Sequence, residues 1–179
     1  MKIKKILILL LIIASVSYAK VEKINDEFDG TYYYQTKSLD IYDGLKVPRP
    51  EVRFRTTKVK EKHSLIMELN VLSSALMSVN DKNKVRIKCN NGSIVTLNYE
   101  DTISSKGNGF GYLGNAVEGL RTWNKLTDTD IEALLSGVNM IRIEIKDTFT
   151  NINVDKKTSN KLIKLLNEII KELEAEYKK

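Results

Sequence analysis

The first half of the chain alternates apolar and polar residues with the period of a β-strand. Residues 51–59 and 64–72 both show this alternation, and only the charged stretch 60–63 separates them. Strict alternation is typical of strands that bury one face, and a short polar link between two of them favours an antiparallel hairpin. A third β-prone segment covers 31–37, and the stretch 38–50, which contains Pro and Gly, is expected to be a loop.

The register of a second hairpin can be predicted from its turn. Two β-prone segments, 85–89 and 93–97, flank Asn91 and Gly92. A two-residue turn would place apolar residues of one strand opposite cations of the other. A three-residue loop places apolar residues opposite apolar residues and puts Gly92 in a left-handed conformation. We therefore expect the three-residue loop, with Cys89 on the apolar face. The expected pairs are Ile87 with Val95 and Val85 with Leu97.

The second half of the chain contains helix signals. Thr127 suits an N-cap, Asp130 completes a capping-box pattern and Gly137 suits a left-handed C-terminal cap, so a helix is predicted over 128–136. A long amphipathic helix is predicted from Asp155 or Thr158 almost to the end of the chain. Its apolar stripe consists of Leu162, Leu166, Ile169 and Leu173, widened by Ile163, Leu165 and Ile170. Further strands are expected within 112–123, at 140–146 and at 149–154.

Strands followed by helices, without strict alternation of the two, indicate an α+β fold. We expect a mostly antiparallel sheet of about six strands, a short helix and a long C-terminal amphipathic helix packed on the sheet. Residues 31–179 are expected to form a single domain, preceded by a polar lead-in over 20–30.

The N-terminal segment has the layout of a secretory signal peptide. Lysines near the start are followed by the apolar run 6–14, and Ser17 and Ala19 are small residues at the positions that favour cleavage before Lys20. A membrane-spanning helix needs about 20 apolar residues, and this run is shorter. We therefore expect residues 1–19 to be removed and the mature chain to be exported, periplasmic or extracellular, without a transmembrane segment.

Charge and cysteine content restrict the partners. Removal of the signal segment leaves 26 Lys and Arg against 23 Asp and Glu, a formal charge of +3 instead of +6. This surplus is too small to indicate a nucleic-acid-binding surface, so no nucleic-acid partner is expected. Cys89 is the only cysteine, which excludes an internal disulfide.

The order of these elements resembles a group of small exported bacterial proteins of unknown function. The similar features are the strand–Asn-Gly–strand hairpin from Val85, the Gly-rich segment 102–107, the capped helix 127–135, the strand 141–143, the closing helix, and the strand 52–55. Some members have cysteines in the Gly-rich segment, where this chain has Ser105 and Asn108. The resemblance implies an extracytoplasmic α+β domain and implies no particular activity.

Several short motifs suggest chemistry that their surroundings do not support. Residues 109–114 match G-x-G-x-x-G, but the dinucleotide site needs a buried strand before that motif and a helix after it. His63 and Ser64 lie at a charged hairpin link, and Cys89 is expected on the core face, where thiols are inert. The sequon 91–93 is read as a chance match. We predict no catalytic, metal-binding or cofactor-binding residues and no cofactor.

Five cations are expected to point away from the apolar faces of their strands. They are Arg53, Arg55, Arg86, Lys88 and Arg142. On neighbouring strands they would form a basic stripe for an anionic partner, such as an envelope polymer, a lipid head group or an acidic protein. The alternative is the charged outer face of any half-buried sheet. We thus expect an exported, non-catalytic binding domain; the alternative function is a hydrolase-like enzyme whose site the sequence does not reveal.

Overall fold

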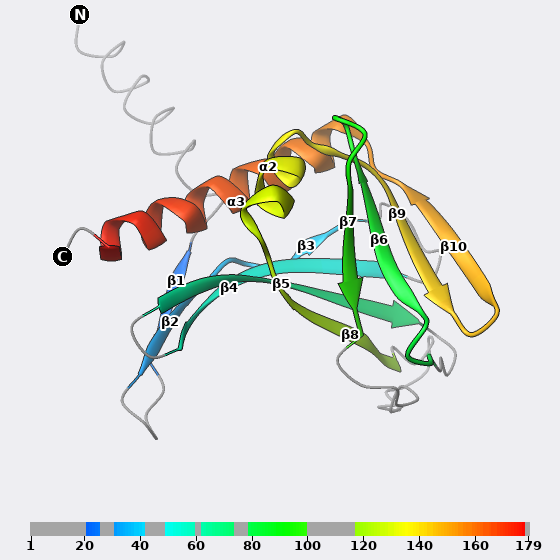
Figure 1. Cartoon of the computed structure of the whole chain (residues 1–179), viewed down its shortest axis with the longest axis horizontal. Coiled ribbons are helices and arrows are strands. Elements are labelled where there is room, and N and C mark those ends of the chain that lie inside the picture. Colours follow the sequence, from blue (N-terminus) through cyan, green and yellow to red (C-terminus); the bar gives the residue numbers. More distant parts are fainter. Residues whose placement is uncertain are drawn as a thin grey trace, which may run out of the picture.

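A computed structural model describes residues 21–25, 31–41, 49–59, 62–73, 79–99 and 117–177. In these ranges ten strands form two sheets, every strand pair is antiparallel, and two helices accompany them (Figure 1). The predicted α+β class is confirmed, with more strands than the six expected. Neither of the helices in these ranges contains an apolar stretch long enough to cross a membrane.

The first sheet has the order β1 (Glu22–Asn25), β2 (Tyr32–Gln35), β4 (Arg49–Val59), β5 (Lys62–Ser73) and β8 (Val117–Lys125), and β3 (Leu39–Asp40) also pairs with β4. The second sheet has the order β10 (Thr148–Asn153), β9 (Val138–Ile145), β6 (Lys84–Cys89) and β7 (Ile94–Asn98). The helices are α2 (Asp128–Leu135) and α3 (Lys156–Tyr177).

The two sheets meet where β7 runs beside β8. Tyr99 and Thr122 form an isolated bridge there, and the Asn124 side chain donates to the Asn98 carbonyl at 2.8 Å and accepts from the Asn98 N–H at 2.9 Å. Figure 1 shows the second sheet standing at a steep angle to the first, with α2 and α3 on the side enclosed by both. Each sheet therefore has an inner face toward the helices and an outer face away from them.

One hydrophobic core fills the enclosed side. The predicted stripe of α3 supplies Leu162, Leu166 and Ile169, which are fully buried, and β4 supplies Val52 and Phe54. Residues of both sheets and both helices belong to this single cluster. The apolar faces of the strands are thus used by the core, and their charged faces form the outside of the molecule.

The predicted register of the second hairpin is confirmed. Ile87 lies opposite Val95, and Gly92 has a φ of +86°, as the three-residue loop requires. Cys89 is completely buried on the apolar face. The Asn90 side chain donates to the Ser136 carbonyl at 3.1 Å, so the hairpin tip is fixed to the end of α2.

The helix caps also agree with the sequence. The Thr127 side chain accepts from the backbone N–H of Asp130, and Asp130 accepts from the N–H of Thr127, which completes the capping box. Gly137, which follows the C-cap Ser136 of α2, has a φ of +100°. Asp155 accepts from the N–H of Thr158 at 2.9 Å at the start of α3.

Three segments differ from the expectation. The lead-in contains β1, whose Ile24 lies opposite Tyr33, and the expected loop 38–50 contains β3 and the start of β4. The expected link 60–63 is shorter, because β5 already begins at Lys62. β1 and β3 are short or polar and form through pairing with a neighbour, so periodicity alone does not reveal them.

Candidate anion-binding faces

The expected basic stripe is divided between the two sheets. Arg53 and Arg55 lie on β4 in the first sheet, whereas Arg86 and Lys88 lie on β6 and Arg142 lies on β9 in the second. Three strands, β5, β8 and β7, separate β4 from β6, so the condition that all these strands are neighbours is not met. The outer faces of the two sheets are therefore separate candidate sites.

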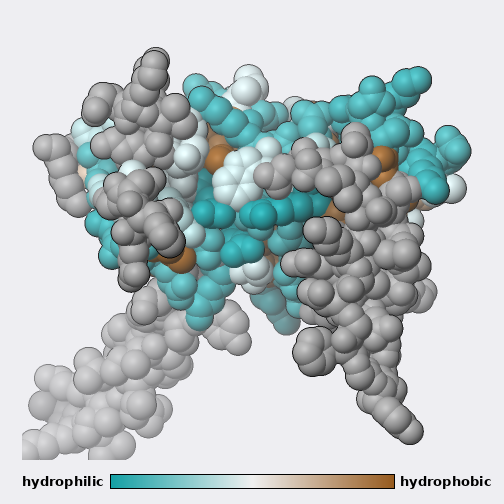
Figure 2. Space-filling view, turned by 90° about the horizontal axis from the view of Figure 1, so that it is seen from below, coloured by the Kyte–Doolittle hydropathy of each residue, from teal (hydrophilic) through white to brown (hydrophobic). Residues whose placement is uncertain are grey.

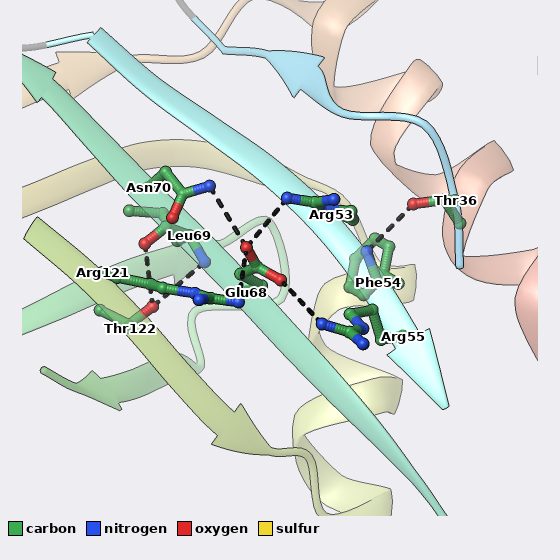
Figure 3. Close-up of polar contacts among 9 residues, drawn as sticks. All are labelled: Thr36, Arg53, Phe54, Arg55, Glu68, Leu69, Asn70, Arg121 and Thr122. Atoms are coloured by element: carbon green, nitrogen blue, oxygen red, sulfur yellow. Dashed lines mark hydrogen bonds and ion pairs between the residues drawn. The ribbon is translucent and has the colours of Figure 1, made fainter. Parts of the chain in front are cut away.

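On the first sheet, three guanidinium groups surround one buried carboxylate (Figure 3). Glu68 on β5 is only 1% exposed, and its Oε1 lies 3.0 Å from Nη2 of Arg53 and 3.1 Å from Nη2 of Arg121. Nη1 of Arg55 lies 3.9 Å from Oε2. We call Arg53, Arg55, Arg121 and Glu68 the arginine cluster; it combines three positive charges with one negative charge.

Aromatic rings hold two of these guanidinium groups in place. Arg55 lies over the ring of Tyr33 at 4.0 Å and over the ring of Trp123 at 4.7 Å, and Arg121 lies over Trp123 at 4.9 Å. Such contacts are attractive because the ring face is electron-rich. Burial lowers the pKa of Arg55 from its ordinary value. Figure 2 shows the molecule from this side, with hydrophilic residues predominating and pale residues of intermediate hydropathy among them.

Some polar atoms of the cluster have no hydrogen-bond partner. Nε of Arg53, Nε of Arg55 and Oε2 of Glu68 are buried and lack one among the residues that the structure describes. Buried polar groups are normally satisfied, so unsatisfied ones call for a specific explanation. The side chains of Arg53 and Arg121 remain 27% and 42% exposed, so part of each is in contact with solvent.

On the second sheet, the other three cations line a hollow of about 160 Å³. Arg86 forms an ion pair with Glu144, with 3.1 Å between Nε and Oε1. Arg142 donates from Nε to the Asn151 side chain at 2.9 Å. This face is less buried than the arginine cluster and carries apolar as well as charged side chains.

The other sequence motifs give no further candidate site among the described residues. Residues 109–114 and the side chain of His63 lie outside the described residues. The sequon 91–93 is exposed at a hairpin tip. Burial, with a smaller contribution from the charge of Asp130, raises the pKa of Cys89 to about 11. Among the described residues, no three His, Cys, Asp or Glu side chains gather closely enough to hold a metal ion.

The sequence prediction missed Glu68, Arg121 and Trp123. Glu68 occupies a polar position in the alternation of 64–72, which indicated its outward direction but not its burial. Arg121 and Trp123 lie two residues apart in the expected strand segment 112–123 and so share one face, but no local signal indicates that this strand pairs with β5.

Comparisons of the chain with protein-family models, curated proteins and solved structures found no match. Fold and surface therefore define the class of protein: an α+β domain of two antiparallel sheets around one helix-covered core, with cations on both outer faces.

Proposed function

We propose that this chain is an exported, non-catalytic domain that binds an anionic partner through the arginine cluster. The observation that carries the proposal is the convergence of Arg53, Arg55 and Arg121 on the single carboxylate of Glu68. Arg53, Arg55 and Arg121 outnumber the carboxylates of Glu68 on β5 and Glu51 on β4, so a positive surplus on this face would attract an anion from outside. The signal-like segment 1–19 supports export, and hence an envelope polymer, a lipid head group or an acidic protein as the partner.

The geometry of the cluster favours binding because its side chains are already held in place. Glu68 and the rings of Tyr33 and Trp123 restrict the guanidinium groups, so less side-chain entropy is lost when an anion binds. Arginine also presents several N–H donors in one plane, which suits carboxylate and phosphate groups.

Polyglutamate and polyphosphate provide a direct test with the mature chain. Trp123 is the only tryptophan and contacts two cluster arginines, so its fluorescence reports binding at this face. We expect binding at low salt that weakens steeply toward physiological salt. Arg53→Gln and Arg121→Gln should each weaken it about tenfold, because each removes a charge-assisted contact.

Lys171→Gln is the matched control. It removes one positive charge from the exposed side of α3 and should leave the affinity almost unchanged. Arg121→Gln is the more secure of the arginine variants, since Arg121 is 42% exposed while Arg53 and Arg55 still face Glu68. Equal weakening by lysine and arginine variants, or no binding of either polymer at low salt, would overturn the proposal.

A further inference from the structure

A separate hollow on the outer face of the second sheet combines positive charge with apolar walls. Its volume is about 160 Å³. The lining residues come from three adjacent strands, β6, β7 and β9. They are Arg86, Lys88, Ile94, Met140 and Arg142. We call this feature the second-sheet hollow.

The cations of this hollow are placed close to one another. Arg86 on β6 lies directly opposite Arg142 on β9, and Lys88 follows on the same face of β6. Like charges directly opposite each other destabilise a strand pair. Glu144 forms an ion pair with Arg86, but neither Lys88 nor Arg142 has an acidic partner within the described residues. The repulsion between these cations would be relieved by an anion in the hollow.

Arg142 is held in position before any ligand arrives. Its Nε donates to the Asn151 side chain at 2.9 Å, and its guanidinium lies 4.3 Å from the centre of the Phe149 ring. Asn151 lies opposite Arg142 on β10, so the neighbouring strand fixes the side chain. A restricted arginine loses less entropy on binding than a mobile one.

The walls of the hollow suit hydrocarbon. Ile94 is 60% exposed, which is high for a large aliphatic residue, and Met140 is only partly buried. A hydrocarbon chain bound in the hollow would cover part of the Ile94 and Met140 side chains and so remove it from water. The free-energy gain is proportional to the apolar area that is covered. A cavity of about 150 Å³ can hold a benzene-sized molecule. The hollow is therefore large enough for a short apolar segment.

We propose that the second-sheet hollow binds a free amphiphilic anion, with a carboxylate or phosphate head group and a short alkyl chain. The head group would lie among Lys88, Arg86 and Arg142, and the chain along Ile94 and Met140. The cations converge on one small hollow instead of spreading over a broad plane, which favours a single molecule over a membrane surface. This site is independent of the arginine cluster, because it lies on the other sheet.

Octanoate and octyl phosphate are the probes, titrated below their micelle-forming concentrations into the mature ¹⁵N-labelled chain. Amide chemical shifts should change at residues of β6, β7 and β9 that line the hollow. Acetate and inorganic phosphate have the head group without the chain, and octanol has the chain without the charge. We expect each of these three to bind at least about tenfold more weakly, since it lacks either a charge-assisted contact or the apolar contact.

Substitutions separate the two halves of the site. Lys88→Gln and Arg142→Gln should each lower the affinity for octanoate about tenfold, and Ile94→Asn should lower it while leaving acetate binding unchanged. Ile94 and Lys88 are exposed, so these two variants should fold normally. Arg121→Gln is the control from the first sheet and should not affect octanoate binding.

Three outcomes would overturn the proposal. Equal affinity for octanol would show an apolar contact alone, and equal affinity for acetate would show an ion site alone. Sedimentation with phosphatidylglycerol vesicles in the absence of octanoate binding would indicate a membrane surface as the partner. Each result is distinguishable from failure of the arginine cluster, which is tested by different ligands and by Trp123 fluorescence.

Discussion

Two glycines at positive φ differ in the space around them. Gly92 and Gly137 have φ values of +86° and +100°. Nothing lies within 4 Å of a Cβ added at Gly92, whereas a Cβ at Gly137 would overlap the Asn90 side-chain nitrogen and lie 3.0 Å from Oγ of Ser159. Both neighbours are engaged, since Asn90 donates to Ser136 and Ser159 accepts from the N–H of Val138.

We therefore expect Gly137→Ala to be more destabilising than Gly92→Ala. Both variants place alanine in a left-handed conformation, which costs about 1–2 kcal/mol. Gly137→Ala must in addition disturb two hydrogen bonds, so its total cost should be about 3 kcal/mol. Urea unfolding of the two variants measures the difference, and equal midpoints would contradict the crowding around Gly137.

Cys89 should react slowly with a thiol reagent in the native protein and rapidly once the protein is unfolded. The side chain is fully buried, and burial raises the pKa of its thiol to about 11, so little thiolate is present at neutral pH. Native and urea-denatured protein are compared by the rate of labelling. Rapid native labelling would mean that the hairpin opens locally or that Cys89 is accessible.

Sequence reasoning placed Cys89 correctly but did not find the arginine cluster. The direction of Cys89 follows from local register, because its neighbours in the hairpin are only a few residues away. The cluster brings Arg53, Glu68 and Arg121 together from three strands, and their order in the sheet is set by tertiary packing. An outward glutamate can be predicted from alternation, but its burial by three arginines cannot.

At the scale of elements, the last turns of α3 are attached to β2 through one carboxylate. The hydroxyl of Tyr32 donates to Oε2 of Glu176 at 2.6 Å, and the hydroxyl of Tyr34 donates to Oε1 at 2.7 Å. The hydrogen bond to Glu176, followed by burial, raises the pKa of Tyr34 to about 12. A deprotonated Tyr34 would have no proton to donate to the Glu176 carboxylate, and the two negative charges would repel each other.

This contact predicts a loss of stability at high pH. The pKa of Tyr34 is about 10 in the unfolded chain and about 12 in the folded one, so its contribution is complete below pH 10 and is lost as the pH rises toward 12. Burial also raises the pKa of Tyr99, which adds to the loss. Glu176→Gln should lower the pKa of Tyr34 toward its ordinary value and so reduce the dependence of stability on pH.

Urea midpoints measured between neutral and alkaline pH compare the wild type with Glu176→Gln. Tyr99→Phe serves as the control, because it removes the other shifted tyrosine and leaves Glu176 intact. Parallel curves for wild type and Glu176→Gln would contradict the role assigned to this carboxylate.

Local signals explain which elements could be predicted. The capping box at Thr127 and the apolar stripe of α3 are encoded within a few turns, and both hairpins have a short link between periodic strands. β1 and β3 lack such signals, since one contains charged residues and the other is only two residues long. Their pairing with β2 and β4 depends on tertiary contacts, which the local sequence does not encode.

At the scale of the whole molecule, a shared core predicts cooperative unfolding. The first sheet contains Trp123, the only tryptophan, and the second contains Cys89, the only cysteine, so each sheet has its own reporter. Because α3 packs against a cluster formed by both sheets, we expect the two reporters to give the same urea midpoint.

Trp123 fluorescence and the accessibility of Cys89 to a thiol reagent, measured in the same urea series, test this expectation. Leu166→Ala removes a fully buried side chain of α3 and should shift both midpoints together, at a cost of about 2–5 kcal/mol. Separate midpoints would show that the two sheets unfold as independent units.

The partition of the strands into two sheets was beyond sequence reasoning. Alternation places Arg53 and Arg86 on polar faces, but it does not indicate whether β4 and β6 are neighbours. That relation depends on β7 running beside β8, through the bridge of Tyr99 to Thr122. The single stripe was expected only on neighbouring strands, and β4 and β6 are not neighbours, although the cations of both strands lie on outer faces as expected.

The attachment of α3 to β2 also bears on how fast the chain reaches its native state. Tyr34 and Glu176 are 142 residues apart in sequence, and the backbone N–H of Leu69 donates to a side chain 53 residues away. Folding rates fall as the average sequence separation of native contacts rises, so a sheet of this kind should form slowly. The chain should therefore stay largely unstructured until α3 has been synthesised. Delayed folding would leave the chain extended for longer after synthesis, which is compatible with the proposed export.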